Sequence, residues 1–414
     1  MSKLDELIQK LYPNGVEYKK LIECLSRPIT DGPHETPHLI NEGIPFISVE
    51  SIHDGIVDLS RCRGYISKEY DQICSKKYKP QKGDVFLVKS ASVGKVAMVT
   101  NDEDFNIWSP LAAMRCNSKV MIPRFLFYVL QTDRIQQLVL NKSSKGSQSN
   151  LSMRVLEQFD IPVPPMEVQC EIVQILDQFT LLIAELTAEL TARRQQYEFY
   201  REKLLTEDSL VKRKEYKLNE LSTIKGRIGF RGYTVDDLVK KGEGAISLSP
   251  GNIQNGHIIF DNNTYLSWGK YFESPEIMLE VGDVVICKTG STVGKVAYVE
   301  ELPVETTLNP QLVVLKKIEC NSKYLYYYLL NNQAQYYIKS NAGIGSVPNI
   351  SQEKLGNLII ELPSLEEQQR IVDILDKFDA YCNDLTQGLP AEIELRKQQY
   401  EYYRDKLLSF KELK

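Results

Sequence analysis

The stretch Gln195-Gln196-Tyr197-Glu198-Phe199-Tyr200-Arg201 recurs near the end of the chain as Gln398-Gln399-Tyr400-Glu401-Tyr402-Tyr403-Arg404. Further segments recur ahead of these two in the same order, for example residues 93–97 as residues 293–297. A fixed order of matching segments is the mark of an internal repeat. The chain is therefore a tandem duplication, and we expect its two copies to be related by a pseudo-two-fold axis.

Each repeated stretch lies near the end of a long segment in which apolar and aromatic residues are spaced alternately four and three apart. This spacing predicts a helix that pairs along a seam, so we expect the two helices to form an antiparallel coiled coil. The predicted seam comprises Ile172, Leu176, Phe179, Ile183, Leu186, Leu190, Tyr197, Tyr200 and Leu204, with Ile371, Leu375, Phe378, Leu385, Tyr400, Tyr403 and Leu407. The second spacing slips around Gly388-Leu389-Pro390, which predicts a stutter or a break there.

A mixed α+β (α/β) globular domain is expected ahead of each long helix. Runs rich in β-branched residues predict strands at residues 85–88, 96–100, 284–287 and 296–299. Pro123 is expected in the first turn of a helix, and Ser322 is expected to be the N-cap of its counterpart. The predicted segments are a first domain (1–160), a first long helix (161–206), a second domain (207–360) and a second long helix (361–414).

The formal net charge of −5 is unusual for a protein that binds nucleic acid, but the acidity is concentrated in the two long helices. Residues 166–206 hold seven acidic and four basic side chains, and residues 365–414 hold eleven and eight. The rest of the chain is close to neutral. Any binding to phosphates must therefore come from local basic clusters.

The eight cysteines contain no C-x-x-C pair, which argues against a zinc ribbon or a redox motif. Scattered cysteines fit a cytoplasmic protein. No apolar run is long enough to predict a membrane span. Residues 1–12 are charged and helical in pattern, unlike a signal peptide.

The ordered motifs resemble those of the specificity subunit of type I restriction-modification enzymes, over essentially the whole chain. The shared pieces are Asp31-Gly32-Pro33-His34, the two Gly-Asp-Val segments followed by Val-Gly-Lys, Asn150-Leu151-Ser152 and Asn349-Ile350-Ser351, and the two Gln-Gln-Tyr-Glu helix ends. The resemblance implies two target-recognition domains that each read one half of a split DNA sequence, with the coiled coil as the spacer between them.

The resemblance also implies partners for a chain that is not itself an enzyme. These are double-stranded DNA, two methylation subunits and two restriction subunits with translocase and nuclease activity. S-adenosylmethionine, ATP and Mg²⁺ are expected on those subunits, so we expect no cofactor and no metal in this chain.

Short basic segments are the candidate contacts to DNA. The two loops before Val-Gly-Lys either hold phosphates or are ordinary hairpin turns with solvated lysines, and the sequence leaves both open. A glycine-rich basic stretch opens the second domain, where DNA contact is favoured over a solvated loop. The candidate residues are Lys76, Lys77, Lys89, Ser90, Ser92, Lys95, Lys225, Arg227, Arg231, Lys288, Thr289, Ser291 and Lys295.

Catalytic patterns are incomplete. His34-Glu35-Thr36-Pro37-His38 fits the zinc-protease pattern H-E-x-x-H, but Pro37 predicts a loop rather than the helix that such a site needs. Asn309-Pro310-Gln311-Leu312 lacks the aromatic residue that would stack on a flipped base. The tyrosines at positions 324 and 326–328 could stack on bases, but their helical spacing favours core packing.

Three alternatives to a DNA-reading subunit of a type I system remain open. The chain could cleave or methylate DNA unaided, although the catalytic motifs for either reaction are missing. It could be a coiled-coil scaffold joining two protein-binding domains. It could also be the specificity part of a smaller, type IIB-like restriction system.

Overall fold

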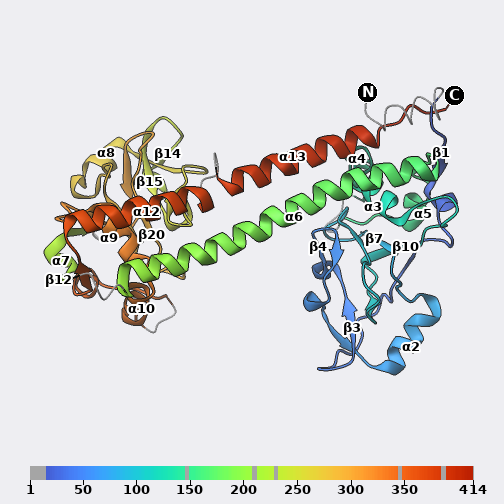
Figure 1. The fold of residues 1–414 in the computed structure, drawn as a ribbon, viewed down its shortest axis with the longest axis horizontal. Coiled ribbons are helices and arrows are strands. Elements are labelled where there is room, and N and C mark those ends of the chain that lie inside the picture. The colour runs from blue at the N-terminus through green and yellow to red at the C-terminus, as the bar shows by residue number, and fades with distance from the viewer. Residues whose placement is uncertain are drawn as a thin grey trace. The chain divides into compact units, whose positions relative to one another are not determined.

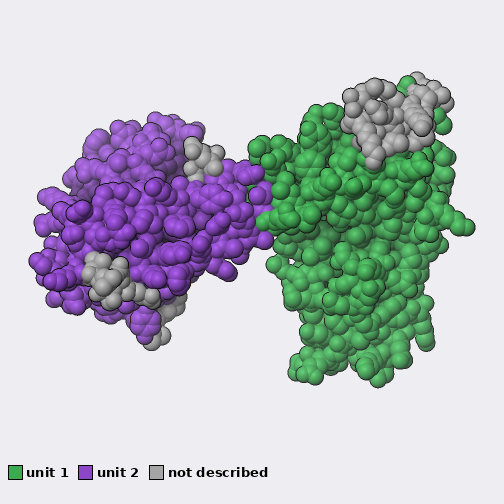
Figure 2. Space-filling model, in the orientation of Figure 1, with its two compact units in different colours: residues 1–185, 393–414 green, residues 186–392 purple. Residues whose placement is uncertain are grey.

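The structure is a computed structural model that describes residues 15–144, 149–207, 212–227, 232–343, 347–383 and 388–413. It divides into two compact units (Figure 2). Unit 1 holds residues 1–185 and 393–414, and unit 2 holds residues 186–392. The helical expectation for residues 1–12 lies outside the described residues. This division falls inside the helices Met166–Glu202 and Leu389–Leu407, not at the borders predicted from the sequence. The predicted borders of the four segments therefore stay predictions.

Unit 1 is built on a six-stranded sheet with the order β2-β10-β7-β8-β5-β4. Its strands are β2 Thr30–Asp31, β10 Leu111–Met114, β7 Val85–Val88, β8 Val96–Met98, β5 Ile56–Val57 and β4 Ile52–His53. The smaller sheets are β6 Gly64–Ile66 with β3 Ile44–Ile47 and β9 Asn106–Ile107, and β1 Tyr18–Lys20 with β11 Asp160–Pro162. The short helices are α2 Lys68–Lys77, α3 Pro123–Gln131, α4 Asp133–Lys142 and α5 Met153–Leu156.

The strand β7 is buried on both faces, which explains its unbroken apolar sequence. Successive side chains of a strand point to opposite faces. Val85 and Leu87 accordingly pack with α3, whereas Phe86 and Val88 pack in a second cluster across the sheet. The predicted strand at 85–88 and the predicted helix from Pro123 are both confirmed.

Unit 2 repeats this plan with a four-stranded sheet ordered β13-β22-β19-β20. Its strands are β13 Thr223–Gly226, β22 Leu312–Lys316, β19 Val284–Cys287 and β20 Val296–Tyr298. The other sheets join β14 Leu238–Val239, β18 Thr264–Ser267, β15 Gly244–Leu248 and β21 Thr306–Leu308, then β16 Ile253–Gln254 with β17 His257–Ile258, and β12 Lys214–Lys217 with β23 Ile359–Leu362. The short helices are α7 Leu218–Leu221, α8 Trp268–Phe272, α9 Ser322–Leu329, α10 Asn332–Asn341 and α11 Gln352–Gly356.

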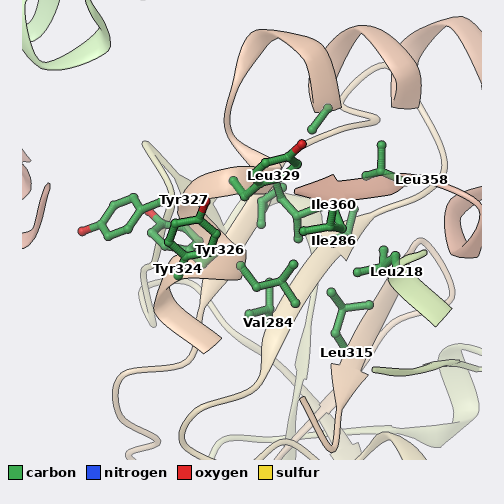
Figure 3. Close-up of a cluster of buried hydrophobic side chains, with 14 of the residues drawn as sticks. Leu218, Val284, Ile286, Leu315, Tyr324, Tyr326, Tyr327, Leu329, Leu358 and Ile360 are labelled. Carbon is green, nitrogen blue, oxygen red and sulfur yellow. The ribbon is translucent and has the colours of Figure 1, made fainter. Parts of the chain in front are cut away.

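In unit 2 the side chains of β19 alternate between two core clusters, as those of β7 do in unit 1. Val284 and Ile286 of β19 pack beneath α9 and its tyrosines (Figure 3), while Val285 and Cys287 face the second cluster. The four tyrosines at 324 and 326–328 are at most 3% exposed, which confirms core packing. One prediction was wrong: Asn321, not Ser322, caps α9, because its side chain accepts the Tyr324 N–H at 3.0 Å.

The long helices are α6 Met166–Glu202, followed by the π-helical turn Lys203–Glu207, and the pair α12 Leu365–Asn383 and α13 Leu389–Leu407 (Figure 1). In unit 1 the ring of Phe179 on α6 stacks on Tyr403 of α13, with centroids 5.5 Å apart. In unit 2 Tyr200 of α6 stacks on Phe378 of α12 at 5.8 Å. All four rings belong to the predicted seam, so the seam pairs within each unit.

The pairing within unit 2 is antiparallel. Arg194 of α6 approaches the carbonyl of Cys382 at 3.5 Å, whereas Tyr200, further along α6, meets Phe378, which is earlier in α12. In unit 1 the start of α6 lies beside the end of α13 (Figure 1). The seam also contacts the globular cores, because Ile172, Leu176, Ile371 and Leu375 are fully buried in them.

The second helical segment is divided where the heptad spacing slips. Gly388 is not helical and α13 begins after it at Leu389, which agrees with the predicted stutter or break; residues 384–387, between α12 and Gly388, lie outside the described residues. Pro390 occupies the first turn of α13, where a missing N–H costs no helical hydrogen bond. Leu385, a predicted seam residue, lies outside the described residues.

Residues 16–18 meet residues 410–413 in unit 1. The N–H of Val16 donates to Lys411 O at 2.7 Å, and the N–H of Leu413 donates to Val16 O at 2.9 Å. The Tyr18 hydroxyl donates to Phe410 O at 3.0 Å. Among the described residues, no helix is both long enough and apolar enough to cross a membrane.

Candidate nucleic-acid interface

Two equivalent loops carry most of the candidate residues: residues 89–95 between β7 and β8 (the first lysine loop) and residues 288–295 between β19 and β20 (the second lysine loop). Each is closed by the same pair of hydrogen bonds. Val88 and Cys287 donate N–H groups to Lys95 O and Lys295 O, both at 2.8 Å. In the opposite direction, the N–H groups of Gly94 and Gly294 donate to Val88 O and Cys287 O at 2.9 and 3.0 Å.

A second segment fastens each loop from outside. The N–H of Leu151 donates to Lys89 O at 2.8 Å, and the N–H of Ile350 donates to Lys288 O at 2.9 Å. The Thr289 hydroxyl adds a bond of 2.6 Å to the side chain of Asn349. The Asn-Leu-Ser and Asn-Ile-Ser segments, which in the sequence were only shared motifs, therefore have a physical role: they hold the lysine loops.

One glutamine in each unit fixes the glycine of the loop. The side-chain amide of Gln136 donates to Gly94 O at 3.0 Å and to Leu130 O at 2.7 Å. Gln335 donates to Gly294 O and Leu329 O, both at 2.8 Å. The sequence analysis did not identify either glutamine. Gln136 lies in α4 and Gln335 in α10, each in the helix after a predicted one, and the two glutamines are almost as far apart in the sequence as the two loops are.

Glycine is required at both of these loop positions. Gly94 and Gly294 have φ angles of +102° and +94°, a region that favours glycine. A Cβ added to either would lie 2.6 or 2.8 Å from the glutamine oxygen. Backbone conformation and close packing therefore both explain why the two loops keep this glycine.

The two loops differ in length by one residue. The second loop has the N–H of Val293 donating to Gly290 O at 3.1 Å, a bond made possible by the extra residue. Gly290 has a φ of +100°, and Ala91 at the corresponding place in the first loop has a φ of +66°. The two domains thus present loops of the same construction but different outline.

Lys89 and Lys77 both pair with one carboxylate of the first domain, although Lys89 is buried and Lys77 is exposed. The carboxylate of the buried Asp31 lies 3.2 Å from Lys89 Nζ and 2.6 Å from Lys77 Nζ. Burial raises the pKa of Asp31, but the hydrogen bond and charge of Lys77, with the charge of Lys89, outweigh it and hold the pKa below its usual value. Because Lys89 is only 8% exposed, its ammonium holds Asp31 rather than projecting from the loop.

The last lysines of the two loops lie in different surroundings. Lys95 is exposed. Lys295 donates to Ile253 O at 2.8 Å and to Pro250 O at 3.3 Å, which holds the second loop against the turn before β16. Ser92 and Ser291 are exposed, and Ser90, Thr289 and Lys288 are half-buried.

Arg227 is an internal residue of unit 2, not part of a solvated basic stretch. It is 5% exposed and donates to Leu308 O at 3.1 Å and to the Thr307 hydroxyl at 3.2 Å. Lys225 lies two residues earlier, in β13, and is exposed. Lys76, near the end of α2, is also exposed. Arg231 lies outside the described residues. DNA contact by the candidate residues stays a prediction.

A cavity of about 720 Å³ extends from the second lysine loop to α6 within unit 2. Four basic side chains line it, namely Arg194, Arg201, Lys295 and Lys339, against the two acids Glu198 and Asp379. This excess of positive charge continues the basic character of the loop, which suits an approach by phosphate groups.

The H-E-x-x-H segment forms a loop, as its proline predicted. His34 Nε2 lies 3.3 Å from Asp31, so this histidine belongs to the same ion-pair cluster as Lys77 and Lys89. Within the described residues, no group of three or more His, Cys, Asp or Glu side chains is arranged to hold a metal ion.

Two segments of the chain, residues 33–193 and 197–395, match the family described as the type I restriction modification DNA specificity domain. The chain therefore belongs to this family and carries two copies of its domain. The family is that of the specificity subunits, which are recognised as non-catalytic.

Known proteins support the same assignment. The chain is 32% identical over 321 residues to the type I restriction enzyme EcoR124I/EcoR124II specificity subunit of Escherichia coli, covering 74% of this chain and 76% of that protein. Its fold is similar to a chain in a structure of complex assembly in a type I restriction-modification system, with a TM-score of 0.63, 17% identity and coverage of 96% and 98%. The type I S subunit of M. genitalium is also similar, with a TM-score of 0.51 and 15% identity over 95% and 96% of the two chains.

Proposed function

We propose that this chain reads a DNA target in two parts, with one half-site for each globular domain, and that partner methylation and restriction subunits act where it binds. The observation that carries the proposal is the repeated lysine loop. Each unit holds the same hairpin by the same contacts from Asn-Leu-Ser or Asn-Ile-Ser and from one glutamine. Two rigid loops of one construction suit two separate contacts with one duplex.

The two half-sites should differ in sequence. The second loop has one residue more than the first, and its final lysine is bonded to neighbouring carbonyls while Lys95 is exposed. Base identity is read from the pattern of donors and acceptors in the major groove. Domains with different side chains around a common loop are expected to read different patterns there.

Catalysis belongs to the partners in this proposal. S-adenosylmethionine would bind the methylation subunits, and ATP and Mg²⁺ would serve the translocating nuclease subunits. The proposal includes two copies of each partner, which matches the two copies of the domain in this chain. The proposal is supported by the family membership and by the similar proteins, which are specificity subunits of type I systems.

The test is DNA binding by the full chain assembled with its methylation subunits. Three duplexes are compared: the complete target, one with the first half-site scrambled and one with the second scrambled. Specific sites are typically bound at least about 10³-fold more tightly than non-specific DNA, so each scrambled duplex should bind much more weakly. Equal affinity for all three duplexes at several salt concentrations would contradict the proposal and favour a protein scaffold.

A further inference from the structure

An arginine of the first domain lies over the ring of a tryptophan, and the N–H groups of its guanidinium make no hydrogen bond to the described residues. The guanidinium carbon of Arg63 lies 3.8 Å from the centroid of the Trp108 ring. Arg63 is exposed, and its guanidinium forms no hydrogen bond or ion pair with any described residue. A stacked guanidinium is held in one plane and presents a fixed fork of N–H donors.

The Asp31-Gly32-Pro33 motif packs against this tryptophan. A Cβ on Gly32 would lie 1.8 Å from Ile107 O and 2.8 Å from the Cα of Trp108, so only glycine allows this approach. The N–H of Ser109 donates to Pro33 O at 3.3 Å. The backbone that carries the Trp108 ring is therefore held by this motif.

The stacked pair is connected directly to the first lysine loop. The N–H of Lys89 donates to Pro110 O at 2.8 Å, two residues after Trp108. Asp31, next to Gly32, holds the ammonium groups of Lys77 and Lys89. The platform and the loop are thus parts of one bonded assembly in unit 1.

We propose that Arg63, placed over the ring of Trp108, reads a guanine of the first half-site by donating two hydrogen bonds to its O6 and N7. Paired donation to these atoms is the commonest specific contact that arginine makes in the major groove. This inference rests on the proposed function, because it names a base-reading residue of the first domain. Trp108 is a positioning residue that acts through Arg63.

The second domain has a different residue at this place. Asn309 corresponds to Trp108, because its N–H donates to Leu248 O at 2.9 Å as that of Trp108 donates to Ile47 O at 3.0 Å. The Asn309 amide donates to the Gln311 side chain at 3.2 Å. No stacking platform is present at Asn309, so this guanine contact belongs to the first half-site.

The test uses the complex with methylation subunits and a set of duplexes, each with one base pair of the first half-site replaced. Wild type should discriminate against loss of one G·C pair by roughly 10- to 100-fold. Arg63→Ala and Arg63→Lys should both lose this discrimination, because lysine keeps the charge but not the planar fork. Discrimination at the second half-site should stay unchanged, and Trp108→Leu should weaken the same single position.

Arg61→Lys is the matched control. Arg61 is an exposed arginine two residues away whose Nε lies 3.2 Å from Asp58, and this variant should discriminate as wild type does. Full discrimination by Arg63→Lys would overturn the proposal. So would a uniform loss of affinity for all duplexes in Arg63→Ala with a smaller salt dependence, because that pattern indicates a phosphate contact. Failure of the proposed function differs, since wild type itself would then not distinguish the duplexes.

Discussion

Gln136 and Gln335 show how a single side chain can set the position of a lysine loop. Each uses both amide protons, one on the loop glycine and one on a carbonyl near the end of the preceding helix. Carbonyls in the last turn of a helix have no partner within that helix, so a side-chain donor satisfies them. The loop is thereby fastened to the helical layer of its own unit.

Replacing one glutamine should weaken the recognition of one half-site only. Gln335→Leu removes two donors and leaves two carbonyls without them, at a cost of about 1–3 kcal/mol in the free energy of unfolding. Affinity for duplexes should then depend less on the second half-site and remain fully dependent on the first. Gln136→Leu should give the mirror result. Equal losses at both half-sites in either variant would refute a local role, and chemical denaturation monitors the stability of both variants.

Residue types alone did not separate internal from exposed cations. Lys89 was a candidate because it opens a tight Gly/Ser turn that ends at Lys95, and Arg227 because it lies in a basic, glycine-rich stretch. Their burial depends on Asp31, 58 positions before Lys89, and on the carbonyl of Leu308, 81 positions after Arg227. Such long-range partners leave no local pattern. Lys95, Lys76 and Lys225 carry the same charge without such partners and are exposed.

At the scale of elements, the hairpin β16–β17 of the second domain contacts helix α12 through an ionisable pair. His257 Nε2 lies 2.9 Å from Asp379 Oδ2. The corresponding hairpin of the first domain, β4–β5, has Ile56 in place of His257, and Thr180 takes the place of Asp379 in the repeat. This histidine–carboxylate contact between domain and helix is therefore found in the second copy only.

The stability of unit 2 should fall as pH rises from near neutral. The hydrogen bond to Asp379 and its charge raise the pKa of His257 above 6.5 despite burial. A pKa raised on folding gives stability that is complete below about 6.5 and is lost as pH passes the raised value. His257→Ile, which copies the first domain, should remove this dependence. Unfolding free energies measured from about pH 5.5 to about pH 8.5 test this, and an unchanged slope in the variant would contradict it.

The helices were predictable from the sequence because their evidence is local and periodic. The four seam rings Phe179, Tyr200, Phe378 and Tyr403 pair across the helices as the heptad spacing indicated. The break before Pro390 was visible in the same spacing. The strands at 96–100 and 296–299 ended earlier than predicted, at Met98 and Tyr298, because the regular pairing is interrupted there: Val99 O and Val299 O accept from Gly83 and Gly282 instead of from Asp84 and Asp283.

At the scale of the molecule, the duplication could be recognised because its repeated segments keep their order. The arrangement of each domain into sheets could not, because the partners of β2 or β13 are distant in the chain. The contact of Val16 with Lys411 and Leu413 was equally hidden, since it is made by backbone hydrogen bonds, which almost any sequence can form.

The same duplication offers the most direct test of one half-site for each domain. In each copy the first and last strands of the globular domain pair, β1 with β11 and β12 with β23, so the domain starts and ends at one place. Residues 214–362 can therefore be exchanged for residues 18–162 while both long helices are kept. Methylated sites are then mapped in a strain that carries this chain with its partner subunits. We expect a target with two copies of the first half-site, and persistence of the original second half-site would refute the assignment of one half-site to each domain.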